Sequence, residues 1–112
     1  MTDIIIYTTE EKLNHKKGLQ KGEEAFEEFY WTFKSLPKKL EIGDKVYFAI
    51  KGFIRGYFIV NDINKSPLYF ADVPENNIIW NKNSWVELKE KIPTKSFQGF
   101  KYVDKVEELN EK

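Results

Sequence analysis

The sequence contains no cysteine, one histidine and one arginine among its 112 residues. The absence of cysteine excludes disulfide bonds, a thiol nucleophile and every metal site built on thiolates. Because His15 is the sole histidine, no histidine cluster can bind a metal, and a Ser-His-Asp triad would depend on a residue flanked by Asn14 and Lys16. We therefore predict no metal, no cofactor and no catalytic residue.

Long apolar segments and low-complexity tracts are also missing. No apolar run reaches the roughly 20 residues that a membrane-spanning helix requires, and residues 4–6 are too short for a signal peptide. Neither a repeat nor a Pro/Gly/Ser-rich linker divides the chain, so we predict one domain over residues 1–112. We expect it to be cytoplasmic, with residues 104–112 as a helical or frayed tail.

Charge is balanced overall but unevenly distributed. The net charge is −3 over residues 1–33, +5 over residues 34–101 and −2 over residues 102–112. A basic middle between acidic ends either forms a footprint for an anionic partner or reflects abundant lysine alone.

Aromatic residues are plentiful, and the first third of the chain shows two kinds of periodicity. Residues 4–7 are apolar and β-branched and predict a strand, and the hydroxyls at residues 8–9 precede two glutamates, as in a helix N-cap. We predict a helix over residues 22–30, because aromatic residues recur at helical spacing. The competing signal is the strand-like alternation of Phe29, Trp31 and Phe33.

The segment IGDKVYFAIKGFIRGYFIV, residues 42–60, predicts a β-hairpin. Gly43-Asp44 opens the first strand and Lys51-Gly52 forms the turn. The return strand alternates between two faces, with Ile54, Gly56, Phe58 and Val60 on one and Phe53, Arg55, Tyr57 and Ile59 on the other. Both faces are largely apolar, which favours a strand pair wrapped into a barrel.

The second half of the chain predicts further short elements. Strands are expected at residues 68–71 and 78–80 and, entered through Gly99, at residues 100–103. Between them, Ser84 caps a predicted helix with Trp85, Leu88 and Ile92 at helical spacing. Several short strands with close turns predict an α+β fold, a small mixed β-barrel with two or three short helices.

The hairpin of residues 42–60, together with FYWTFKSLP upstream and SFQGFKYV near the end, resembles the PUA-like superfamily. These small pseudo-barrels include the PUA, ASCH, EVE and YTH domains. No branch is assigned, since the Gly-x-Lys-x-x-x-Arg signature of ASCH domains and the aromatic-cage trio of YTH domains are absent. The resemblance implies a pseudo-barrel that binds RNA or a modified base.

Aromatic faces that stack bases, next to cations that contact phosphates, bind single-stranded nucleic acid. We predict a binding site with one wall upstream of the hairpin, one arginine on the barrel, a polar and aromatic rim, and a closing loop before the last strand. Its residues are Trp31, Lys34, Ser35, Arg55, Asn81, Trp85, Lys95, Phe97 and Gln98.

These residues also have structural interpretations. Trp31 starts a strand and packs inside, Trp85 belongs to the core, and Arg55 pairs with an acid such as Asp44. Lysine runs such as residues 34–39 are ordinarily solvated faces.

The functional prediction is a non-catalytic domain that binds RNA or a modified nucleobase or nucleotide. One alternative is a small nucleotide-directed enzyme on the same barrel, with Lys and Tyr side chains acting in place of histidine. Another is a protein-interaction module whose aromatics anchor an interface.

Overall fold

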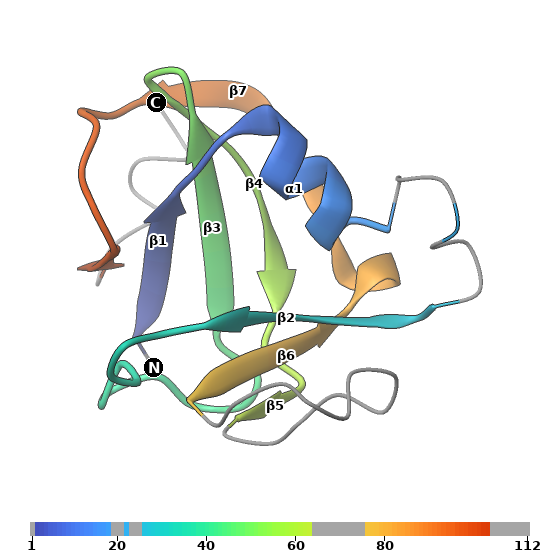
Figure 1. Ribbon diagram of the computed structural model, residues 1–112. Helices are drawn as coiled ribbons and strands as arrows, with labels where there is room; N and C mark the ends of the chain where they lie inside the picture. The colour runs from blue at the N-terminus through green and yellow to red at the C-terminus, as the bar shows by residue number, and fades with distance from the viewer. Residues whose placement is uncertain (1, 19–21, 23–25, 64–75, 104–112) are drawn as a thin grey trace.

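The computed structural model describes residues 2–18, 22, 26–63 and 76–103 (Figure 1). The predicted strand at residues 68–71 and the tail at 104–112 lie outside this range. The elements in chain order are β1 (Asp3–Tyr7), α1 (Glu10–Lys16), β2 (Glu28–Thr32), β3 (Lys45–Ile50), β4 (Phe53–Ile59), β5 (Asp62–Ile63), β6 (Asn77–Asn81), the 3-10 helix η1 (Lys82–Ser84), β7 (Val86–Pro93) and β8 (Phe100–Val103).

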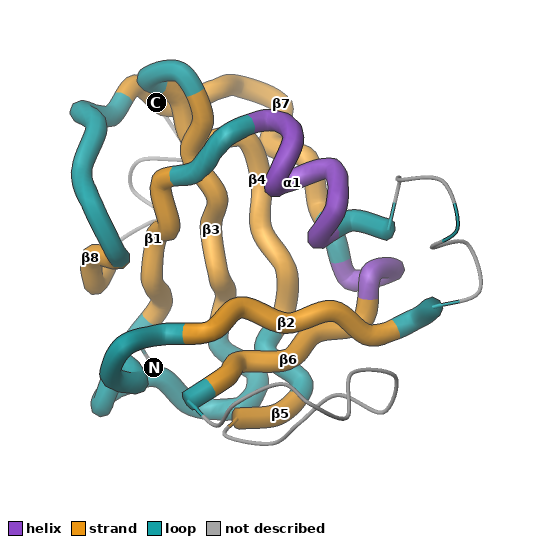
Figure 2. Tube along the Cα trace, in the orientation of Figure 1, coloured by secondary structure: helices purple, strands orange, loops and turns teal. Residues whose placement is uncertain are grey.

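The described strands form two sheets, which confirms the predicted α+β class. One sheet has five strands in the order β7-β4-β3-β1-β8, and the other has three in the order β2-β6-β5. The β1–β3 pair is parallel and the other pairs are antiparallel. Figures 1 and 2 show β2 and β6 crossing the strands of the larger sheet at a steep angle.

The two sheets are joined where β4 runs into β5. The amide of Val60 donates to the carbonyl of Asp44 at 2.9 Å, and the next amide, that of Asn61, donates to the carbonyl of Ile79 at 2.8 Å. The consecutive residues Val60 and Asn61 are therefore hydrogen-bonded to different sides of the junction, Val60 to the residue before β3 and Asn61 to β6. Away from this junction, β8 is the edge strand of the larger sheet and β2 is the edge strand of the smaller one. No ladder between described residues pairs these two strands to close a barrel.

Among the described residues, no helix is long and apolar enough to cross a bilayer.

The predicted hairpin and both of its turns are confirmed. Lys51 and Gly52 have φ of 51° and 88°, the left-handed conformation that a two-residue hairpin turn requires. At the other turn, Gly43 has φ of 97°, and the carboxylate of buried Asp44 accepts the amide of Glu41 at 2.8 Å. These turns fix where β3 begins and ends.

The predicted facing of the return strand was wrong, because β4 contains a bulge. Phe48 pairs with Gly56, but the next pair is Ala49 with Ile54, which leaves Arg55 as an additional residue. The bulge moves Ile54 to the opposite face from Phe58, so the two side chains enter different cores.

The helix predicted after Ser84 was also wrong, because Ser84 ends η1 and the following residues form β7. Ile92 pairs with Ile54, and Glu87 pairs with Gly56. These two pairs are two residues apart along β4 but five residues apart along β7, so β7 bulges between them. Leu88 and Ile92 are both buried in the same apolar cluster, because residues four apart share a face in a strand as they do in a helix. Their spacing of four residues imitated a helix.

The helix predicted over residues 22–30 is contradicted by β2, which begins at Glu28. Phe29 and Phe33 are buried in one core, and Trp31 packs against the same core. The strand-like alternation of Phe29, Trp31 and Phe33, and not the helical spacing, therefore matches the observed strand. Trp31 therefore shares a face with the two phenylalanines, contrary to the helical interpretation.

Two apolar clusters lie on opposite faces of the larger sheet. The first lies between the two sheets and α1, and the second lies under β7 and contains Tyr47, Ala49 and Ile54. In the first cluster Trp80 is 0% exposed and stacks on Phe58, with 4.8 Å between centroids and 17° between planes. Its indole N–H donates to the carbonyl of Lys16 at 3.1 Å, which attaches the end of α1 to the smaller sheet.

We expect Trp80→Phe to lower the free energy of unfolding by about 1–3 kcal/mol, because the carbonyl of Lys16 loses a buried donor and the smaller ring leaves a space. Urea unfolding followed by circular dichroism measures this. Trp85→Phe is the matched control and should cost less than about 1 kcal/mol, since its indole bond to Glu87 is exposed. Equal costs in the two variants would contradict the role assigned to the Trp80 bond.

Candidate nucleic-acid interface

Helix α1 places basic side chains beside β2. Thr9 is its N-cap, with the hydroxyl accepting the amide of Lys12 at 3.2 Å, which confirms the predicted helix start. Lys12 and Lys16 are four residues apart and so lie on the same side of the helix. The indole bond from Trp80 holds the last turn, where Lys16 is located.

Three adjoining cavities lie along α1 and β2. The first, of about 480 Å³, is lined by Thr9, Glu11, Lys12 and His15. The second, of about 300 Å³, is lined by Lys12, His15, Lys16, Tyr30, Trp31 and Thr32. The third, of about 320 Å³, is lined by Trp31, Thr32, Phe33, Lys34, Ser35, Gly99 and Phe100. Each shares two residues with the next, so together they form one surface feature, here called the α1–β2 groove.

The groove lies where the two sheets separate. Its third cavity is bounded by the end of β2 and the start of β8, which are the edge strands of their sheets (Figure 2). The sheets are joined through β4 and β5, and they open between β2 and β8. At this opening the third cavity is lined by aromatic side chains that also belong to the core, Phe33 among them.

Trp31 lines both the second and the third cavity. It is partly buried, and its ring contacts Phe48 edge-on, with 5.5 Å between centroids and 61° between planes. In the third cavity, Phe33 and Phe100 meet edge to face at 5.5 Å. These contacts hold the rings in fixed orientations, which reduces the entropy lost when a flat ligand stacks on them.

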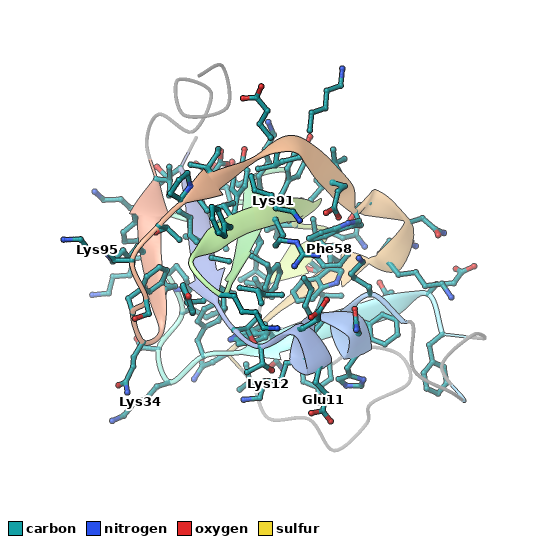
Figure 3. The ribbon with its side chains drawn as sticks, turned by 90° about the horizontal axis from the view of Figure 1, so that it is seen from above. Glu11, Lys12, Lys34, Phe58, Lys91 and Lys95 are labelled. Carbon is teal, nitrogen blue, oxygen red and sulfur yellow. The ribbon has the colours of Figure 1, made fainter. Side chains whose placement is uncertain are left out.

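Lysines outnumber acids along the groove. The lining includes Lys12, Lys16 and Lys34, and Glu11 is the one carboxylate among the described lining residues. The Nζ atom of Lys16 lies 4.2 Å from the centroid of the Tyr30 ring. Figure 3 shows Glu11, Lys12 and Lys34 projecting from one side of the molecule and Lys95 from another. The groove thus combines aromatic walls with an excess of positive charge.

The structure brings together Trp31, Lys34 and Ser35 from the predicted site, all in the third cavity. Lys95, Phe97 and Gln98 lie in the loop that leads to Gly99. Phe97 packs edge-on against Tyr7 at 5.5 Å, while Lys95 and Gln98 are exposed. The loop thus reaches the groove through its final residue, Gly99, and through Phe100.

Arg55 and Trp85 meet in a separate cluster centred on Glu87. One oxygen of Glu87 accepts the indole N–H of Trp85 at 3.0 Å, and the other lies 3.8 Å from Nε of Arg55. The acid paired with Arg55 is therefore Glu87, whereas the sequence suggested Asp44. Lys17 covers the Trp85 ring at 4.7 Å. Neither Arg55 nor Trp85 lines any of the three cavities formed by described residues.

Asn81 has a local structural role. It is the N-cap of η1, where its side-chain oxygen accepts the amide of Asn83 at 2.8 Å. Its backbone carbonyl accepts the hydroxyl of Ser84 at 2.7 Å.

Several groove residues were absent from the predicted site: Lys12, His15, Lys16, Tyr30, Thr32, Phe33, Gly99 and Phe100. The spacing of Lys12 and Lys16 after a helix cap was a usable signal. The contribution of Phe100 was not, because it depends on β8 lying near β2, and these strands are distant in sequence.

No protein-family model, curated protein or solved structure matches this chain. Across residues 2–18, 22, 26–63 and 76–103, no group of three His, Asp or Glu side chains is placed to hold a metal ion.

We expect the three tryptophans to differ in acrylamide quenching of their fluorescence. Trp80 is 0% exposed, whereas Trp31 and Trp85 are partly exposed. A Trp31→Phe, Trp85→Phe double variant, which retains Trp80, should be quenched less than the wild type, and Trp80→Phe should be quenched more. Equal quenching of all three proteins would mean that Trp31 is not accessible from the groove.

Proposed function

We propose that this chain is a non-catalytic PUA-like domain that binds single-stranded RNA, or a modified nucleobase within it, in the α1–β2 groove. One observation carries the proposal: three adjoining cavities that share lining residues and whose walls include aromatic rings and lysines. Single strands are bound by such surfaces, because bases stack on aromatic faces while cations follow the phosphates.

The chemistry of the groove assigns different tasks to its residues. Trp31 supplies an indole face to a base, and Lys12, Lys16 and Lys34 neutralise phosphates on either side of it. The hydroxyl of Ser35 and the backbone at Gly99 offer hydrogen bonds to the edge of a base in the third cavity. None of these tasks requires a proton transfer or a covalent intermediate.

The PUA-like pseudo-barrel is the fold that we propose for the two sheets. Supporting features are the Gly43-Asp44 turn that opens β3, the tight hairpin to β4, and the continuation of β4 into the second sheet. The groove lies at the opening of this arrangement, between β2 and β8. In a barrel with one open side, such a position exposes aromatic side chains to a ligand without exposing the whole core.

We expect binding of a single-stranded RNA hexamer to weaken as salt rises. If about three phosphates are neutralised, the slope of log K against log salt is about −2, so a tenfold rise in salt weakens binding about 100-fold. Fluorescence anisotropy with a labelled hexamer measures the slope. A slope near zero, or a stable dimer that buries Trp31 in place of RNA, would favour the interaction-module alternative.

We expect Trp31→Ala to weaken hexamer binding about 5- to 150-fold, the equivalent of the roughly 1–3 kcal/mol that one stacked base contributes. Trp85→Ala is the matched control outside the groove and should change binding less than about twofold, with folding of both variants checked by circular dichroism. Similar losses in the two variants would place the RNA elsewhere.

We expect Lys34→Ala to weaken binding and to reduce the magnitude of the salt slope by about 0.7, the contribution of one phosphate on a single strand. Lys91→Ala, an exposed lysine of β7 that does not line the groove, should leave both quantities unchanged (Figure 3). Equal effects of the two substitutions would indicate attraction by overall charge without a defined site.

A further inference from the structure

We infer that Trp31 divides the groove into two base subsites, so that the smallest complete ligand is a dinucleotide with one base on each side of the indole. This inference rests on the proposed function and adds the size of the ligand. Among their described lining residues, the second and third cavities share Trp31 and Thr32, and they have similar volumes of about 300 and 320 Å³.

Trp31 is held as a rigid partition. Its backbone lies in β2 opposite Ile78 of β6, and its ring is fixed against Phe48, which is itself 0% exposed. A ring anchored in this way cannot swing into either cavity without losing its packing contact. Two stacked bases separated by one fixed side chain are therefore favoured over one base that pushes the ring aside.

The two subsites have different walls. The helix-side subsite is lined by Lys12, His15, Lys16 and Tyr30, and the Tyr30 ring is already covered by Lys16. The Nζ atom of Lys16 lies farther from Trp31, 5.9 Å from the centroid of its ring. On this side the base is therefore assigned to Trp31, with Lys16 beside it for a phosphate. The loop-side subsite has Phe33 and Phe100 as aromatic walls, with Lys34 beside them.

Gly99 keeps the loop-side subsite accessible. It has φ of 76°, and a Cβ placed there would meet no heavy atom within 4 Å. Packing does not require glycine at this position, but its left-handed backbone does. The missing side chain leaves the backbone of the cavity wall open to the edge of a base.

The first cavity does not supply a third stacking subsite. Among its described lining residues the one aromatic ring is that of His15, which also lines the second cavity and packs edge-on against Phe29 with 6.0 Å between centroids. Glu11 places a carboxylate where a phosphate would follow. A strand that continues past Lys12 thus gains little beyond the second base. The footprint should end at two nucleotides.

The test is calorimetric titration of the full chain with adenosine 5′-monophosphate and with 5′-phosphorylated di-, tri- and hexaadenylate RNA. We expect the step from one to two nucleotides to tighten binding about 5- to 150-fold, the range for one additional stacked base. Each further nucleotide should add less than about threefold.

A Ser35→Leu variant tests the loop-side subsite directly, because Ser35 is an exposed residue lining that cavity and leucine would fill it. Dinucleotide affinity should fall to that of the mononucleotide, while mononucleotide affinity changes less than about twofold. Ser96→Leu is the matched control at another exposed serine that does not line the groove, and it should leave the length dependence intact.

The outcomes separate the two proposals. If the mononucleotide binds as tightly as the dinucleotide, or if Ser35→Leu behaves like Ser96→Leu, the division by Trp31 is wrong and RNA binding stands. Affinity that rises by the same factor from two to six nucleotides also overturns the division. If no RNA of any length binds at low salt, the proposed function itself fails.

Discussion

The hydrogen bond from the indole of Trp80 to the carbonyl of Lys16 is the contact on which the arrangement of the groove depends. Trp80 lies on β6 of the smaller sheet, and Lys16 ends α1, which follows a strand of the larger sheet. Because the donor is fully buried, leaving it without an acceptor would be costly. The bond fixes the last turn of α1 against β6, and β6 pairs with the whole of β2. Both sides of the second cavity are thus set by one core residue.

The same core connects two surface tryptophans. Trp31 contacts Phe48, Phe48 contacts Phe58, and Phe58 contacts Trp85, each with 4.9–5.8 Å between ring centroids. Consecutive lysines at the end of α1 lie over the two ends of this row, with Nζ of Lys16 5.9 Å from the Trp31 centroid and Nζ of Lys17 4.7 Å from the Trp85 centroid. At the Trp85 end, Glu87 already accepts the indole bond and faces Arg55, so this end is closed by internal polar contacts. The Trp31 end opens into the groove.

The sequence predicted the parts of this fold in which local chemistry decides the conformation. The left-handed turn at Lys51-Gly52, the Thr9 cap and the strands that contain residues 4–6 and 78–80 follow from propensity and short-range bonding. It failed where a bulge changed the period. The bulge in β4 puts Ile54 on the opposite face from Phe58. In β7, Leu88 and Ile92 lie on one face at a spacing of four residues, which strands and helices share, so local spacing does not distinguish the two. The same reason explains which residues of the candidate site could be grouped from the sequence: Trp31, Lys34 and Ser35 are near neighbours in the chain, whereas Phe100 is brought to them by sheet topology.

Strand β8 pairs with β1, with Val103 opposite Asp3, so residues from distant parts of the chain meet at one edge of the larger sheet. The entropy of closing so large a loop must be overcome before the pairing contributes any stability. Phe100 and Gly99 reach the loop-side cavity through this pairing. During synthesis on a ribosome, β1, the hairpin and β6 emerge before β8 and can associate while the loop-side wall is still missing. A nascent chain would therefore assemble most of its hydrophobic core first, and docking of β8 would be the step that completes the loop-side cavity.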